Sequence, residues 1–264
     1  FIDTFCRAQI GYRMLGEEPL YQMIDLLVVP ITDNNMRAIA ECWNCYTDVE
    51  VFRFGVPHNK EEDAFNYYLE GLRLLRDRLE KLTGAKVDDE RLREAIDKSN
   101  KIRTLLEQIS LLRQSERPVI SGKEFARLNH ASFYADNSIL VEVLDSLYSE
   151  LKEREAPIPK ARILLTGSTL AMGDYKVLDL VEAAGGAVVV EEFAEGMRHY
   201  WEKVKTDGDF IEALADRYFR YRVPPAWFRP SREGIDFVLK LAHDFSVDGI
   251  IWYQLMYRDS YDIQ

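Results

Sequence analysis

The clearest pattern of hydrophobic and polar positions lies in residues 162–196. A short apolar run at residues 163–165 is followed by a polar turn at residues 166–168 and by apolar positions at helical spacing. Two glycines end that spacing, and a second apolar run covers residues 187–190. We therefore predict a strand, a helix and a strand, the unit from which parallel sheets are built.

The first 60 residues show the same order of elements with a different sequence. Helical spacing at residues 6–15 precedes a short apolar strand at residues 25–31. A helix pattern at residues 36–43 then leads to a second strand at residues 49–56. We therefore expect both halves of the chain to contain a strand–helix–strand unit. The order of elements repeats, whereas the sequence does not.

Helical spacing dominates the rest of the chain, where apolar residues recur three and four positions apart. The charged residues between them are expected to face water. Ser121 and Glu124 have the spacing of a capping box at a helix start. The expected helices cover residues 61–82, 88–113, 139–151, 197–204, 209–219 and 233–245, and a last strand covers residues 249–255.

The sequence predicts an α/β protein with parallel sheets, additional long helices and two domains. The boundary is placed at Ala156-Pro157-Ile158-Pro159, because two prolines stiffen the backbone there. The N-terminal domain, with its helical insertion, then covers residues 1–156, and the C-terminal domain covers residues 157–264.

Composition limits the classes of function. The net charge is −11, and a chain without a basic stripe is a poor candidate for binding nucleic acid. No apolar run approaches the roughly 20 residues of a membrane span, and no signal peptide is present. Three cysteines without disulfide-like spacing indicate a reducing cytoplasm. Because the chain begins at Phe1 and stops soon after its last strand, we expect segments to be missing at both ends.

Candidate binding residues follow the two strands of residues 162–196. In parallel sheets, ligands sit at the carboxyl ends of strands. Thr166, Gly167 and Ser168 lie at one such end, and Glu191 and Glu192 lie at the other. Substrate binding by Thr166, Gly167, Ser168 and Glu192 is one interpretation. The alternative is that these residues only cap a helix and finish a strand.

The cysteines are the second group of candidates. Cys42 and Cys45 form a CxxC, but a redox dithiol favours a helix start and this pair lies at the end of a predicted helix. A zinc site needs a second Cys or His pair, which the four histidines do not supply. At least one of the two cysteines is therefore expected to be a packing residue. Ser–His–Asp, Walker A and GxGxxG motifs are absent from the sequence.

Five stretches in collinear order span nearly the whole chain: FCRAQIGYRMLGEEPLYQMIDLLVVPITDNNMRAIAE, VFRFGVPHNK, NKIRTLLEQISLLRQSERPVISGKEF, RILLTGSTLAMGDYKVLDLVEAAGGAVVVEEFAEGMRHYW and VDGIIWYQLMYRDSYDI. Together they resemble the 2-hydroxyacyl-CoA dehydratase family of D-component type. That family includes benzoyl-CoA reductase subunits and double-cubane cluster proteins.

The resemblance implies a fold, a cofactor and partners. It implies two flavodoxin-like domains and a [4Fe–4S] or double-cubane cluster held by cysteine thiolates. It also implies a homologous partner subunit, in a homodimer or a heterodimer, and an ATP-hydrolysing activator that delivers one electron at low potential. The electron enables loss of water from a 2-hydroxyacyl-CoA through a ketyl radical, or reduction of an acyl-CoA. The protein's task is then to hold the thioester and to exclude water.

The family's cysteines match this sequence only in part. Cys6 corresponds to the first, whereas the second and third would fall near Asn34 and Arg258, where this chain has no cysteine. We therefore predict Cys6 as a cluster ligand and Cys42 and Cys45 as replacements. Three interpretations stay open: a cluster with unusual ligands, a cluster shared with a partner subunit, or a structural subunit that has lost its cluster. A plain small-molecule-binding α/β protein is a weaker alternative.

Overall fold

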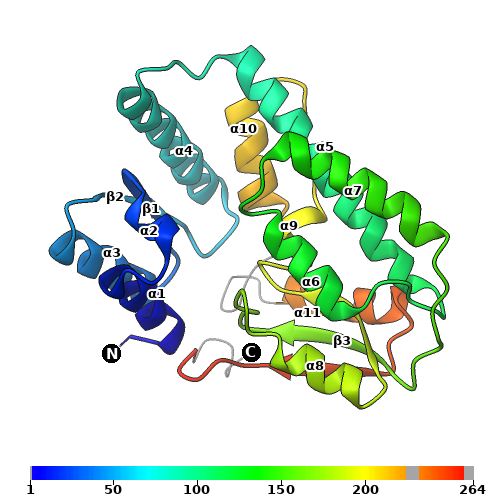
Figure 1. The fold of residues 1–264 in the computed structure, drawn as a ribbon. Helices are drawn as coiled ribbons and strands as arrows, with labels where there is room; N and C mark the ends of the chain where they lie inside the picture. The colour runs from blue at the N-terminus through cyan, green and yellow to red at the C-terminus, as the bar shows by residue number, and fades with distance from the viewer. Residues whose placement is uncertain (1, 224–231, 259–264) are drawn as a thin grey trace. The chain divides into compact units, whose positions relative to one another are not determined.

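The structure is a computed structural model that describes residues 2–223 and 232–258 (Figure 1). It confirms the predicted α/β class with parallel strands. The chain divides into two compact units. Of the residues that the structure describes, unit 1 comprises residues 2–87 and 255–258, and unit 2 comprises residues 88–223 and 232–254. Among the described residues, no helix is both long and apolar enough to cross a membrane.

Unit 1 is built on a pair of parallel strands, β1 (Leu26–Ile31) and β2 (Glu50–Gly55), with Leu26 opposite Glu50 and Ile31 opposite Gly55. Helix α3 (Asn34–Tyr46) connects them and packs beside α1 (Thr4–Leu15). The other helices of this unit are α2 (Pro19–Gln22) and α4 (Glu62–Thr83).

Local sequence explains where α3 begins. The Asp33 carboxylate accepts hydrogen bonds from the backbone N–H groups of Asn35 and Met36, at 2.7 and 3.0 Å. An aspartate at this position satisfies two of the first backbone donors of a helix. The inner face of α3 then contributes Ile39 and Trp43 to the core of unit 1.

Unit 2 contains a three-stranded parallel sheet of β3 (Arg162–Gly167), β4 (Ala187–Glu192) and β5 (Gly249–Tyr253). The strand order is β4-β3-β5, with β3 in the middle. In chain order this is 2-1-3, the order in which a flavodoxin-like sheet begins. Helix α8 (Lys176–Ala183) connects β3 to β4, as the apolar pattern predicted.

Helices surround this sheet. Figure 1 shows α5 (Asp89–Leu111) and α7 (Asn137–Lys152) running side by side. The predicted capping box is confirmed at the start of α6 (Gly122–Ala131), where Ser121 and Glu124 bond each other's backbone N–H groups. The remaining helical segments are a 3₁₀ turn at Leu112–Gln114, α9 (Met197–Tyr200), α10 (Phe210–Ala215), a π-helical turn at Asp216–Arg220 and α11 (Arg232–Asp244).

The helix predicted for residues 197–204 is shorter than expected, because α9 ends at Tyr200. The Asn100 side chain explains the early end. Its amide oxygen accepts from the backbone N–H of Val204 at 2.9 Å, and its Nδ2 donates to the carbonyl of Val204 at 2.7 Å. One side chain therefore satisfies both backbone groups of Val204 without a further helical turn.

The division into units differs from the predicted domains. Residues 88–156 were placed with the N-terminal half, but they belong to unit 2. The apolar stripe of α5, including Leu105 and Ile109, shares a buried core with Leu164 of β3 and Val190 of β4. Helix α5 therefore packs on the sheet of unit 2. Independent folding of residues 1–156 and 157–264 stays a prediction.

Candidate functional site

The carboxyl edge of the unit 2 sheet brings two of the predicted binding residues together. Thr166 lies opposite Glu192 in the β3–β4 register, and each is 2% exposed. The Thr166 hydroxyl oxygen lies 2.9 Å from Glu192 Oε2. Arg198 completes the group, because its Nε and a second nitrogen donate to the same carboxylate, the latter at 3.0 Å. The Glu192 charge is thus neutralised within the unit.

Gly167 and Ser168 complete the strand end. Gly167 has φ +134, and a Cβ on it would lie 2.0 Å from the carbonyl oxygen of Tyr253 on β5. Ser168 is buried, and its backbone N–H donates to that same oxygen at 3.0 Å. These contacts are the structural role of the predicted residues. Their role in substrate binding stays a prediction.

The loops after β3 and β4 meet beside this edge. The Thr169 hydroxyl donates to Glu195 Oε1 at 2.6 Å, and the backbone N–H of Leu170 donates to the same oxygen. Burial raises the pKa of the Glu195 carboxyl. Thr169 and Glu195 were not predicted from the sequence, although both closely follow the strand ends, which was the signal used for their neighbours.

Two histidines also lie near this edge, of which His130 is buried and His199 is half-buried. The Ser132 hydroxyl donates to the carbonyl of Asn129 at 2.6 Å, so its oxygen accepts from Nε2–H of His199 at 3.0 Å. Burial, together with Arg103 and Arg217, lowers the pKa of His199 to about 4. Burial also lowers the pKa of His130, whose Nδ1 lies 3.0 Å from the Tyr175 hydroxyl.

These histidines predict a loss of stability in mild acid. Because the folded-state pKa of His199 lies below that of the unfolded chain, the unfolded state binds the proton first as pH falls. The free energy of unfolding should therefore fall between pH 6.5 and pH 4, by up to about 3 kcal/mol from His199 alone. Urea unfolding at several pH values measures this loss.

The matched variants are His199→Gln and His243→Gln, the latter at a side chain that is 91% exposed. We expect a smaller loss on acidification in His199→Gln and an unchanged loss in His243→Gln. An equal acid loss in wild type and His199→Gln would contradict a lowered pKa of His199 in the folded state.

An ion pair involving β4 is fully buried. Arg113 donates to Glu191 Oε2 at 2.6 Å and to Oε1 at 3.3 Å, with side chains that are 0% and 4% exposed. The Tyr200 hydroxyl contacts Glu191 Oε1 at 3.2 Å, and Ser110 contacts both Arg113 and Tyr200. The expectation that charged residues of this region face water is wrong for Arg113 and for Arg103, which is 6% exposed. Glu191, at a predicted strand end, is therefore part of the buried core, where it pairs with Arg113.

The predicted cluster ligands lie in unit 1. Cys6 is fully buried against Ile39 and Trp43. Its backbone N–H donates to the Asp3 carboxylate at 2.7 Å, and burial together with that carboxylate raises the pKa of the thiol. Cys42 is half-buried and Cys45 is exposed, both on α3.

These residues do not fit a four-thiolate cluster. A [4Fe–4S] cluster bound by cysteine alone takes four thiolates, and this sequence contains three cysteines. Within residues 2–223 and 232–258, no group of three His, Cys, Asp or Glu side chains is placed to hold a metal ion. The structure therefore does not bring Cys6, Cys42 and Cys45 together as a ligand set.

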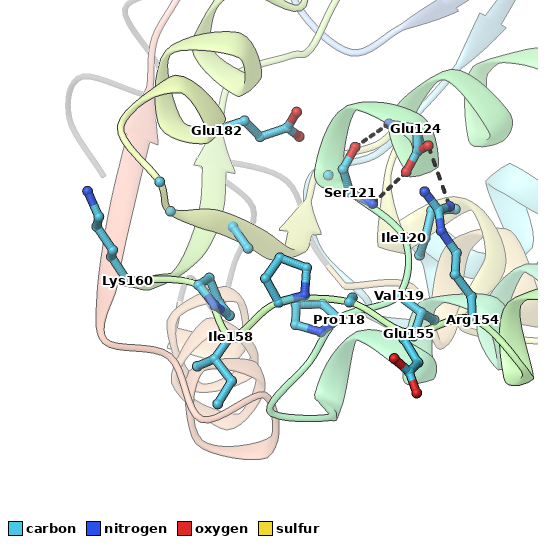
Figure 2. A pocket seen from close by; sticks show the side chains of 17 residues that line it. Pro118, Val119, Ile120, Ser121, Glu124, Arg154, Glu155, Ile158, Lys160 and Glu182 are labelled. Atoms are coloured by element: carbon cyan, nitrogen blue, oxygen red, sulfur yellow. Dashed lines mark hydrogen bonds and ion pairs between the residues drawn. The ribbon is translucent and has the colours of Figure 1, made fainter.

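A cavity of about 500 Å³ lies at the other edge of the unit 2 sheet (Figure 2). It is lined by the amino end of β4 and by a proline-rich segment that includes Pro118 and Ile158. In Figure 2 the capping-box Glu124 also points to Arg154, at 3.6 Å. This cavity opens at the amino ends of the strands, so it is separate from the edge formed by Thr166 and Glu192.

Comparison with known proteins gives a match over the whole chain. The family model described as 2-hydroxyglutaryl-CoA dehydratase, D-component, matches residues 1–264. YjiM of Escherichia coli (strain K12), named provisionally as a dehydratase subunit, is 25% identical over 93% of this chain and 64% of its own length.

Two further relatives have names that state a substrate. The (R)-phenyllactyl-CoA dehydratase beta subunit of Clostridium sporogenes is 22% identical over 98% of this chain and 68% of its own length. A benzoyl-CoA reductase subunit of Thauera aromatica is 25% identical over 80% of this chain and 55% of its own length. The chain thus spans between about half and two thirds of the length of these relatives.

Proposed function

Because this chain belongs to the 2-hydroxyglutaryl-CoA dehydratase D-component family, we propose that it is a subunit of a 2-hydroxyacyl-CoA dehydratase or of a benzoyl-CoA reductase-type enzyme. The family match over residues 1–264 is the observation that supports this proposal most strongly. The names of the relatives support acyl-CoA thioesters as the substrate class.

The iron–sulfur cluster, the homologous partner subunit and the ATP-dependent activator belong, in this proposal, to the assembled enzyme. The cysteines of this chain do not make a four-thiolate set, and the part of the chain that the structure describes does not gather them into one group of ligands. This observation favours a second candidate function, in which the chain lacks a cluster of its own and supports a homologous catalytic subunit.

Within unit 2, we propose that the strand ends at Thr166, Gly167, Ser168 and Glu192 lie next to the bound thioester. The Glu192 carboxylate already accepts hydrogen bonds from the Thr166 hydroxyl and the Arg198 guanidinium. Its part is therefore to fix the ends of β3 and β4 rather than to exchange protons with the substrate.

Metal analysis on protein purified without oxygen tests the cluster-less candidate. We expect the isolated chain to hold little iron and acid-labile sulfide, because one buried thiol and two cysteines on α3 do not assemble a cluster. Cys6→Ala and Cys45→Ala should give the same low values as wild type. About four irons per chain, lost only in Cys6→Ala, would instead show that this chain binds a [4Fe–4S] cluster through Cys6.

The proposed enzyme is tested by assembly. The chain is produced with its homologous subunit and supplied with the activator, ATP and an aromatic or aliphatic 2-hydroxyacyl-CoA or benzoyl-CoA under anaerobic conditions. Dehydration or reduction that requires both subunits supports the proposal. A complete assembly that turns over none of these thioesters would contradict it.

A further inference from the structure

A second candidate binding site lies in unit 1, at the carboxyl ends of its two strands. A cleft of about 540 Å³ is lined there by Ile31, the last residue of β1, and by Gly55, the last residue of β2. Ligand pockets in proteins commonly have volumes of about 300–1,000 Å³. In open parallel sheets, ligands bind at this edge. The cleft therefore has the place and the size of a ligand site.

The charge of this cleft is opposite to that of the chain. Two arginines line it, Arg37 from α3 and Arg53 from β2, together with the single carboxylate of Glu41. Arg53 pairs with Glu41 at 3.1 Å. The charged side chains of the lining therefore sum to +1, although the whole chain carries −11. A positive cleft on an acidic protein attracts anions selectively.

Arg37 supplies the positive charge that is available to bind an anion, because Arg53 is already paired with Glu41. Within the described part of the chain, the Arg37 guanidinium has no ion-pair or hydrogen-bond partner. The first backbone donors of α3 are already bound by the Asp33 carboxylate. An anion in this cleft would therefore be held by the guanidinium group and not by the helix end. Guanidinium groups bind phosphate oxygens in a bidentate manner.

An aromatic ring completes the lining. The Tyr67 side chain lies over Gly55, where a Cβ would come within 2.2 Å of the hydroxyl oxygen. Tyr67 is 60% exposed, so much of its ring is open to a ligand. Aromatic side chains stack with nucleic-acid bases. The cleft thus combines the Arg37 guanidinium, which can bind a phosphate, with the Tyr67 ring, which can stack on a nucleotide base.

We propose that the cleft formed by Arg37, Arg53 and Tyr67 binds the phosphate-bearing adenosine end of a CoA thioester. This proposal rests on the proposed function, which makes acyl-CoA the substrate class. Arg37 pairs with a phosphate, Arg53 stays anchored by Glu41, and Tyr67 contacts the adenine. Recognition of the acyl group is left to other parts of the enzyme.

Calorimetric titration of the whole chain with free CoA tests the site, with pantetheine as the matched ligand that lacks phosphates. We expect CoA to bind and pantetheine to bind at least about tenfold more weakly, because pantetheine offers the Arg37 guanidinium no phosphate. Arg37→Ala should weaken CoA binding by about tenfold and leave pantetheine unaffected. Tyr67→Ala should weaken CoA binding as well.

The control variant is Arg73→Ala on α4, which removes an exposed arginine of the same unit outside the cleft. Unchanged CoA binding in this variant supports the site, whereas an equal loss in Arg37→Ala and Arg73→Ala would show nonspecific attraction and overturn it. Circular dichroism confirms that each variant is folded. Arg37→Lys provides a second test, since it keeps the charge, and should retain part of the affinity.

The two proposals fail in different ways. If the assembled enzyme turns over an acyl-CoA but Arg37→Ala and Tyr67→Ala bind CoA like wild type, only the cleft proposal is overturned. If the isolated chain binds CoA through Arg37 but the assembly transforms no thioester, only the proposed reaction is contradicted. Binding of inorganic phosphate as tight as that of CoA would also overturn the assignment, because it would show that the adenosine contributes nothing.

Discussion

Replacing Arg113 by methionine is expected to lower the free energy of unfolding by about 3–5 kcal/mol. The Glu191 carboxylate, whose side chain is 4% exposed, would lose its cation and keep the contact with the Tyr200 hydroxyl. An uncompensated charge inside a protein is costly, because water no longer stabilises it. Methionine fills much of the arginine's volume, so the loss measures the charge more than a cavity. Urea unfolding followed by circular dichroism gives the value.

The double variant Arg113→Met with Glu191→Leu separates the two causes. Replacing both members of a buried pair by apolar residues of similar size is often neutral or stabilising. We therefore expect the double variant to regain most of the stability that the single variant loses. Arg91→Met is the control, because Arg91 is 70% exposed and lies 3.7 Å from Asp88. It should cost less than about 1 kcal/mol. A double variant no more stable than Arg113→Met would show that packing around Arg113 dominates.

The same pair shows what the sequence can predict. Apolar spacing located the strands, α5 and α7 because burial of one face requires that spacing. It also placed Thr166 and Glu192 at neighbouring strand ends, which the β3–β4 register bears out. The burial of Arg113 was not predictable, because its partner Glu191 is 78 residues away in the chain. A charged residue between apolar positions has the same pattern whether it faces water or a distant carboxylate.

The cysteines show a second limit. The resemblance marked Cys6 by its position in the chain, and the structure shows that the residue is buried. Its pKa is raised first by burial, which includes the packing of α1 on α3, and then by Asp3, a residue that caps α1. Neither contact follows from cysteine spacing. Spacing therefore identifies candidate ligands, whereas their protonation depends on neighbours that only the fold supplies.

Gly167→Ala is expected to destabilise unit 2 by about 4 kcal/mol, from backbone strain and overpacking together. Gly167 has φ +134, a conformation that residues with a Cβ rarely adopt. The new Cβ would lie 2.0 Å from the Tyr253 carbonyl oxygen, so β5 would have to move away from β3. That movement would also break the bond from the Ser168 N–H to the same oxygen. Urea unfolding measures the change.

Gly173→Ala is the matched control for Gly167→Ala. Gly173 lies in the loop after β3 with φ +90, and a Cβ there meets no atom within 4 Å. This variant should show strain alone, about 1–2 kcal/mol. An equal loss in both variants would contradict a close approach of β3 and β5 at Gly167. Because Gly167→Ala alters the strand end itself, lost activity in that variant would not identify a binding residue. Ser168→Ala keeps the backbone bond to Tyr253 and adds no Cβ, so it disturbs the contact between β3 and β5 less than Gly167→Ala does.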